Sequence, residues 1–132
     1  MAEALLTHTL RQRKAPAVVE SAGISALVGY PADPLAQKLM ARRGLDLSSH
    51  RARQLTRDLV RAFDLVLVME AGQQRYVEQL DASARGRVHR IGRIGRFDVA
   101  DPYQRGPGAF EEALAMIERG IGELKGVFWS EA

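Results

Sequence analysis

The chain contains no cysteine among its 132 residues. A thiolate nucleophile, a disulfide and a thiolate metal site are therefore excluded within it. The three histidines, His8, His50 and His89, show no ligand spacing and have no acidic cluster beside them, so neither a metal nor a cofactor is expected. No apolar run approaches the roughly 18–20 residues that a membrane-spanning helix needs. Because the N-terminus also lacks the basic start of a signal peptide, a cytoplasmic protein without membrane contact is predicted.

Charge and glycine patterns exclude further classes. The formal net charge is +3, from 19 basic and 16 acidic residues. The guanidinium of arginine can bind two phosphate oxygens at once, although a basic balance this small is more typical of a solvated surface. Neither a Walker loop nor a dinucleotide fingerprint is present. Phe97 is the one aromatic residue near the arginines from Arg85 to Arg96, which argues against a nucleic-acid surface.

Helix and strand patterns alternate along the chain, and we treat residues 1–132 as one domain. This alternation predicts an α/β fold, a three-layer α/β/α sandwich with a mostly parallel sheet. The apolar run at 65–69 indicates a strand buried on both faces. The expected helices cover residues 1–13, 34–44, 57–63, 71–80 and a final segment from about 110, and the expected strands cover 17–21, 65–69 and 88–91.

Parallel sheets bind ligands in the loops that follow their strands, and the candidate site residues lie at a predicted strand end or in predicted loops. Asp101 precedes Pro102, which favours an extended backbone and lets the carboxylate project from its loop. Tyr103 could then form the wall of a pocket for a flat substrate. Ser21 closes the first strand, and His50 lies among basic and hydroxyl groups. Taken singly, each residue is also typical of a turn or a hydrogen-bonded loop.

The order of the motifs is more specific than any one of them. Met-Ala-Glu-Ala, Val-Glu-Ser-Ala-Gly, Gly-Tyr-Pro-Ala-Asp-Pro, His-Arg-Ala-Arg-Gln-Leu, Asp-Leu-Val-Leu-Val-Met-Glu and Asp-Pro-Tyr follow one another. Together they closely resemble the low-molecular-weight protein tyrosine phosphatases, particularly the bacterial ones, from Met1 to about Leu124. The resemblance implies hydrolysis of phosphotyrosine in proteins through a phosphocysteine intermediate, without metal or cofactor. It also implies Asp101 as general acid/base and Tyr103 as the substrate's aromatic wall.

The resemblance also implies that this chain lacks parts that family members have. Family members begin with an interior strand and a phosphate loop of the pattern Cys-x5-Arg-Ser-Pro, and this chain starts where that loop ends. Ser21 and His50 match residues that support the loop. We therefore expect an N-terminally truncated member of a four-stranded family, inactive as it stands. The exposed gap in the sheet would make the chain fold poorly alone, rearrange or form a dimer.

Partners and rival functions remain open at this level. In bacteria the resembling enzymes often oppose tyrosine kinases that control polysaccharide export, which suggests such a kinase as partner. The alternative is a non-catalytic module that binds a phosphorylated or acidic partner through arginines. Arsenate reduction, performed by relatives with this scaffold, needs several cysteines and is excluded. A nucleic-acid module is a distant alternative.

Overall fold

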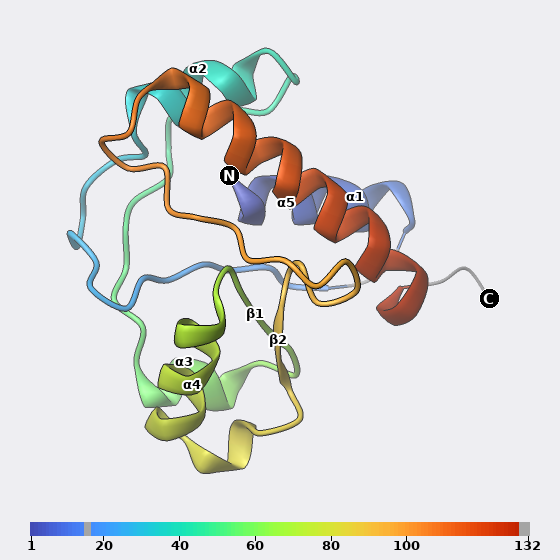
Figure 1. The fold of residues 1–132 in the computed structure, drawn as a ribbon. Coiled ribbons are helices and arrows are strands. Elements are labelled where there is room, and N and C mark those ends of the chain that lie inside the picture. The colour runs from blue at the N-terminus through green and yellow to red at the C-terminus, as the bar shows by residue number, and fades with distance from the viewer. Residues whose placement is uncertain (15–16, 130–132) are drawn as a thin grey trace.

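The computed structural model describes residues 1–14 and 17–129 (Figure 1). None of the helices in these ranges combines the length and the apolar character that crossing a membrane requires. The elements, in chain order, are α1 (Ala2–Gln12), α2 (Pro34–Ala41), α3 (Arg57–Ala62), β1 (Val66–Val68), α4 (Ala71–Leu80), the 3-10 turn η1 (Ala82–Ala84), β2 (Val88–Arg90) and α5 (Pro107–Phe128).

Capping residues begin the helices where the sequence predicts. Asp33 precedes Pro34, and its Oδ1 accepts a hydrogen bond from the backbone N–H of Leu35 at 2.8 Å. Thr56 does the same for α3, since its Oγ1 accepts from the N–H of Leu59 at 3.2 Å. All five predicted helices are confirmed, and their bounds shift by a few residues at the ends.

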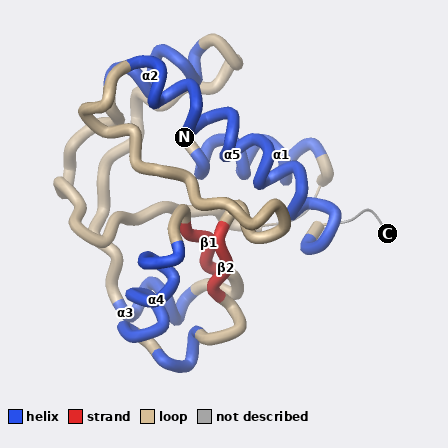
Figure 2. The backbone as a smooth tube through the Cα atoms, viewed as in Figure 1, coloured by secondary structure: helices blue, strands red, loops and turns tan. Residues whose placement is uncertain are grey.

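The sheet is smaller than predicted. β1 and β2 pair in parallel with Val66 opposite Val88, the two red strands of Figure 2. The prediction of a strand at 17–21 is wrong. Val18 is 76% exposed, and the nearest strand-like pairing after it, among the described residues, is an isolated bridge between Gly23 and Gln54. A strand requires a neighbouring backbone to bond with, and the sequence pattern at 17–21 indicates the extended conformation without supplying that partner.

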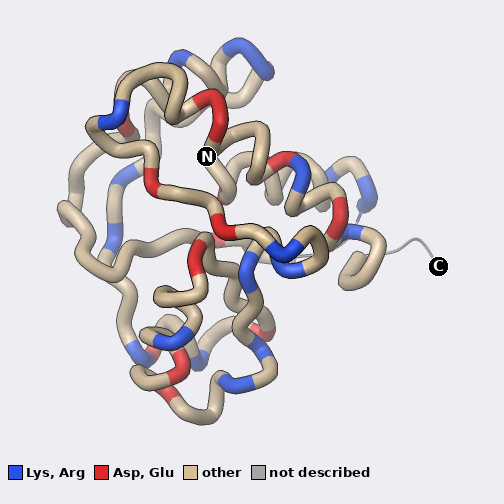
Figure 3. The backbone as a smooth tube through the Cα atoms, in the orientation of Figure 1, with Lys and Arg blue, Asp and Glu red and all other residues tan. Residues whose placement is uncertain are grey.

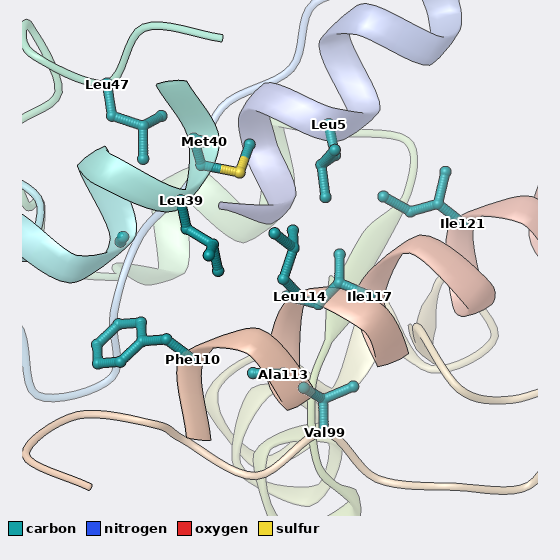
Figure 4. Packing of buried hydrophobic residues seen from close by; sticks show 11 residues of the cluster. Leu5, Leu39, Met40, Leu47, Val99, Phe110, Ala113, Leu114, Ile117 and Ile121 are labelled. Atoms are coloured by element: carbon teal, nitrogen blue, oxygen red, sulfur yellow. The ribbon is translucent and has the colours of Figure 1, made fainter. Parts of the chain in front are cut away.

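Helices cover both faces of the sheet, as an α/β sandwich requires. Figure 1 shows α3 and α4 on one side and α1, α2 and α5 on the other. A small cluster joins Val60 of α3 and Val77 of α4 to the two strands. The larger cluster lies between α1, α2 and α5 and includes Leu5, Leu39, Met40, Leu47, Val99, Phe110, Leu114, Ile117 and Ile121 (Figure 4). The strand predicted at 65–69 is less buried than expected. Val68 is buried, whereas Leu67 is only half-buried.

Two glycines inside α5 do not interrupt the helix. The sequence suggests that Gly120 and Gly122 weaken it, yet α5 is continuous through both. Gly120 is buried and faces Ile91, so close that a Cβ there would stand 2.3 Å from Ile91 Cγ2. Gly120 therefore lets α5 approach the segment that follows β2, whereas Gly122 is exposed with nothing within 4 Å of its missing Cβ.

Candidate functional site

A cavity of about 440 Å³ opens beside the carboxyl end of β1. Its floor is apolar and comes from α2 and α5. Its rim is made by the start of α1, by loops before and after α2, and by the segment leading to α5. The cavity is lined by Met1, Ala2, Glu3, Ala4, Ser21, Pro31, Ala32, Asp33, Ala36, Leu47, His50, Ala52, Met69, Glu70, Gln73, Val99, Ala100, Asp101, Pro102, Phe110, Ala113 and Ile117.

Three of the four candidate residues meet at this cavity. Ser21, His50 and Asp101 all belong to its lining, although 80 positions separate the first from the last. Tyr103 does not line it. Tyr103 lies two residues after Asp101, 51% exposed, on the same loop. The structure thus gathers a carboxylate, an imidazole and a serine at the edge of one apolar hollow.

Asp101 is presented by a turn. Its side chain is exposed, and its Oδ1 accepts a hydrogen bond from the backbone N–H of Tyr103 at 3.0 Å. Gln104 follows with a φ of 60°, a left-handed conformation that completes the reversal. The turn leaves Oδ2 of Asp101 without a protein partner among the hydrogen bonds of the described residues. A carboxyl group so held can exchange a proton with a ligand in the cavity.

His50 contacts an acid that the candidate residues did not include. Its Nδ1 lies 3.5 Å from Oε2 of Glu3, and both side chains are about one-third exposed. Glu3 stands in the first turn of α1, where the helix dipole favours a negative charge. In the sequence, the feature that could have pointed to Glu3 is its place as the acid in Met-Ala-Glu-Ala, where α1 begins. Glu3 therefore places a carboxylate within ion-pairing distance of the imidazole.

The loop that carries Asp101 is fastened to the sheet just before it. Val99 is 2% exposed, and its N–H donates to the carbonyl of Met69 at 2.9 Å. The hydrogen bond from Arg90 lowers the pKa of Asp98, with the N–H of Ala71 and the Arg90 charge adding to the shift. Asp98 therefore stays ionised at neutral pH.

The cavity has no thiolate nucleophile. The sequence has no cysteine. Within the part of the chain that the structure describes, no three His, Asp or Glu side chains are grouped as a metal ion would need. The arrangement offers an exposed carboxylate, an imidazole–carboxylate pair and an apolar floor.

Known proteins match almost the whole chain. The family model described as low molecular weight phosphotyrosine protein phosphatase matches residues 1–128. A probable low molecular weight protein-tyrosine-phosphatase of Ralstonia nicotianae, EpsP, is 50% identical over 122 residues, which cover 92% of this chain and 81% of that protein. The Escherichia coli phosphatase Etp is 35% identical over 111 residues, covering 83% and 75%. Vibrio vulnificus Wzb in complex with benzylphosphonate superposes with a TM-score of 0.87 at 32% identity, over 96% of this chain and 88% of that one. The chain belongs to the low molecular weight phosphotyrosine protein phosphatase family.

Proposed function

We propose that this chain supplies the proton-transfer and substrate-binding parts of a phosphatase acting on phosphotyrosine in proteins, in the cytoplasm, with a thiolate from outside its 132 residues. The observation that carries the proposal is Asp101 at the rim of a cavity shared with Ser21 and His50. A volume of about 440 Å³ lies within the usual range for small-ligand sites. Wzb of Vibrio vulnificus binds benzylphosphonate, in which a methylene group joins a phenyl ring to a phosphonate, and this supports an aromatic phosphate ligand here.

The chemistry requires three groups. A thiolate attacks phosphorus, so that a P–S bond forms while the bond to the tyrosine oxygen breaks. Asp101 donates a proton to the departing phenolate oxygen. In the second step Asp101 takes a proton from water, whose oxygen displaces the thiolate and releases inorganic phosphate. Backbone and guanidinium donors must neutralise the phosphoryl oxygens, and a loop of the pattern Cys-x5-Arg-Ser-Pro provides them.

The second edge of β1, which pairs with no strand among the described residues, supports the place of that loop. Val66 donates its N–H to Arg87, and the carbonyl of Val68 accepts from Ile91, so both residues bond toward β2. Backbone groups alternate between edges in a parallel strand, which turns those of Leu67 to the opposite side. We propose that a strand added at this edge would run parallel to β1 and deliver the loop to the cavity, where Ser21 and His50 support it and Tyr103 flanks the substrate ring.

The decisive experiment compares the chain alone with a version that has an interior strand and a Cys-x5-Arg-Ser-Pro loop joined to Met1. Turnover of p-nitrophenyl phosphate is expected only for the longer version. Asp101→Ala in it lowers kcat by roughly 10²–10⁴-fold, the usual contribution of a general acid. Asp64→Ala, which removes an exposed acid outside the cavity, leaves kcat unchanged. Equal loss in both variants would contradict the role of Asp101.

The physiological substrate is proposed from the resemblance. Bacterial enzymes of this type often oppose tyrosine kinases of polysaccharide export, so a phosphorylated kinase of that kind is the partner we propose. Release of phosphate from such a kinase by the longer version, at a higher kcat/KM than from an unrelated phosphoprotein, is the expected result. Equal rates on the two proteins would argue against the pairing.

Binding without turnover is the second candidate, favoured by the absence of cysteine. Figure 3 shows basic and acidic positions interspersed along the fold, so an anionic partner would meet scattered charges. We expect salt to weaken any such binding, because exposed charges are screened within about 10 Å at 0.1 M. Titration of the chain with a phosphotyrosine peptide tests this candidate.

A second copy of the chain could instead cover the open edge of β1. Sedimentation at several protein concentrations detects such a dimer.

A further inference from the structure

Three consecutive residues, the last of them two positions before Asp101, are each held by a different part of the fold. We call Phe97–Val99 the loop anchor. The ring of Phe97 lies beneath the guanidinium of Arg119, with 4.7 Å between Cζ and the ring centroid. A Cβ at Gly92 would stand 2.1 Å from the carbonyl oxygen of Phe97, so the backbone approach depends on that glycine. Val99 is buried and bonded to Met69, as described above.

Asp98 ties the middle of the loop anchor to two elements at once. Its Oδ1 accepts from Nη1 of Arg90, the last residue of β2, at 2.8 Å. Its Oδ2 accepts from the backbone N–H of Ala71, the first residue of α4, at 3.4 Å. Arg90 Nη1 also reaches the carbonyl of Phe97 at 3.5 Å. One carboxylate therefore bridges the end of the sheet and the N-terminus of a ten-residue helix, where negative charge is favoured.

We propose that the Arg90–Asp98 ion pair is a positioning device that sets where Asp101 stands relative to the cavity, a role that rests on the proposed function of Asp101. Asp101 follows Asp98 by three residues on a segment without helix or strand. Phe97 and Val99 fix this segment by packing, and the ion pair fixes its direction between them. Catalytic groups lose much of their effect when displaced by about 1 Å.

The size of the effect follows from the exposure of the pair. The Arg90 and Asp98 side chains are 26% and 44% exposed. Such pairs contribute little to global stability. Breaking this one therefore loosens the loop and leaves the fold intact, which makes the positioning role separable from a structural one.

The absence of cysteine makes the position of the loop measurable, because two engineered cysteines take spin labels without background. Ala100→Cys and Lys38→Cys, both exposed, place nitroxides on the Asp101 loop and on α2. We expect a narrow distance distribution in the parent and one at least twofold wider in Arg90→Met. Arg90→Lys keeps the positive charge, so its distance distribution is expected to be nearly as narrow as that of the parent. Arg43→Met breaks the exposed Arg43–Glu118 pair of 2.9 Å elsewhere and serves as the matched control.

A reference pair separates local from global loosening. Labels at Lys38→Cys and Glu111→Cys join α2 to α5, and Arg90→Met leaves their distance unchanged. The proposal is overturned if Arg90→Met leaves the loop distribution as narrow as in the parent. It is equally overturned if Arg43→Met widens it as much, or if the reference pair widens too. None of these outcomes depends on catalysis, so failure of the phosphatase proposal would show separately, in the turnover of the longer version.

Discussion

Replacing Gly120 by alanine is predicted to destabilise the fold, whereas the same change two residues later is predicted to stabilise it. Both glycines lie inside α5, and neither has a positive φ. Alanine is favoured over glycine in a helix by about 1 kcal/mol, so propensity alone predicts equal gains. The surroundings differ, because Gly120 is buried against Ile91 and Gly122 is exposed.

The geometry at Gly120 sets the magnitude. A Cβ there would meet Ile91 Cγ2 at 2.3 Å and the Ile91 carbonyl oxygen at 2.6 Å. Side-chain rotation could relieve the first contact, but the second is backbone and requires α5 to move away. Overpacking of this kind costs about 1–3 kcal/mol or more, and a backbone contact places it at the upper end. After the helix gain, Gly120→Ala loses about 1–2 kcal/mol, and Gly122→Ala gains about 0.5–1 kcal/mol.

Urea unfolding at one fixed protein concentration measures the difference. We expect the two variants to lie about 1.5–3 kcal/mol apart in unfolding free energy, with unchanged m values. A Gly120→Ala variant as stable as Gly122→Ala would refute the close approach of α5 to Ile91. A change in m for one variant would instead indicate an altered unfolded state.

Three further predictions concern the core, a cap and pH. Met40 is fully buried, so Met40→Ala lowers the unfolding free energy by about 2–5 kcal/mol, measured in urea, and a loss under 1 kcal/mol would contradict its burial. Asp33→Ala removes the hydrogen bond that caps the N–H of Leu35 and lowers the unfolding free energy by about 1 kcal/mol. Asp33→Asn keeps a capping oxygen and is expected to retain most of that stability in the same assay. The folded pKa of Asp98 is lowered by Arg90, so its contribution is present above the unfolded Asp pKa of about 4 and is lost as pH falls through the lower folded value. The difference in urea midpoint between the parent and Asp98→Asn therefore shrinks below about pH 4, and a constant difference would contradict the linkage.

Local signals in the sequence predicted the helices well, because a helix bonds within itself. Asp33 with Pro34 and Thr56 begin their helices as expected. The segment 17–21 failed for the opposite reason. Its β-branched residues favour an extended backbone, but a strand forms only against a partner, and residue preference carries no information about that partner. The packing role of Gly120 could not be read from the sequence either, since it depends on Ile91, a residue 29 positions away.

The site was predicted less from chemistry than from order. Ser21, His50 and Asp101 are individually ordinary loop residues, and the succession of motifs identified them together. The fold explains why they meet: the segment before α2 carries Ser21, the segment after α2 carries His50, the segment before α5 carries Asp101, and all three line one cavity. Glu3 was not predicted as a site residue, because its contact with His50 joins α1 to a loop 47 residues later in the chain. The tie between Asp98 and Arg90 also depends on a turn whose path the sequence does not specify.

Turnover of p-nitrophenyl phosphate by the purified 132-residue chain tests the central claim most directly. The account predicts no release of p-nitrophenolate above the rate without protein, because the chain carries Asp101 but no thiolate to attack phosphorus. Steady turnover that disappears in Asp101→Ala would show that the chain has a nucleophile of another kind, and would contradict the account.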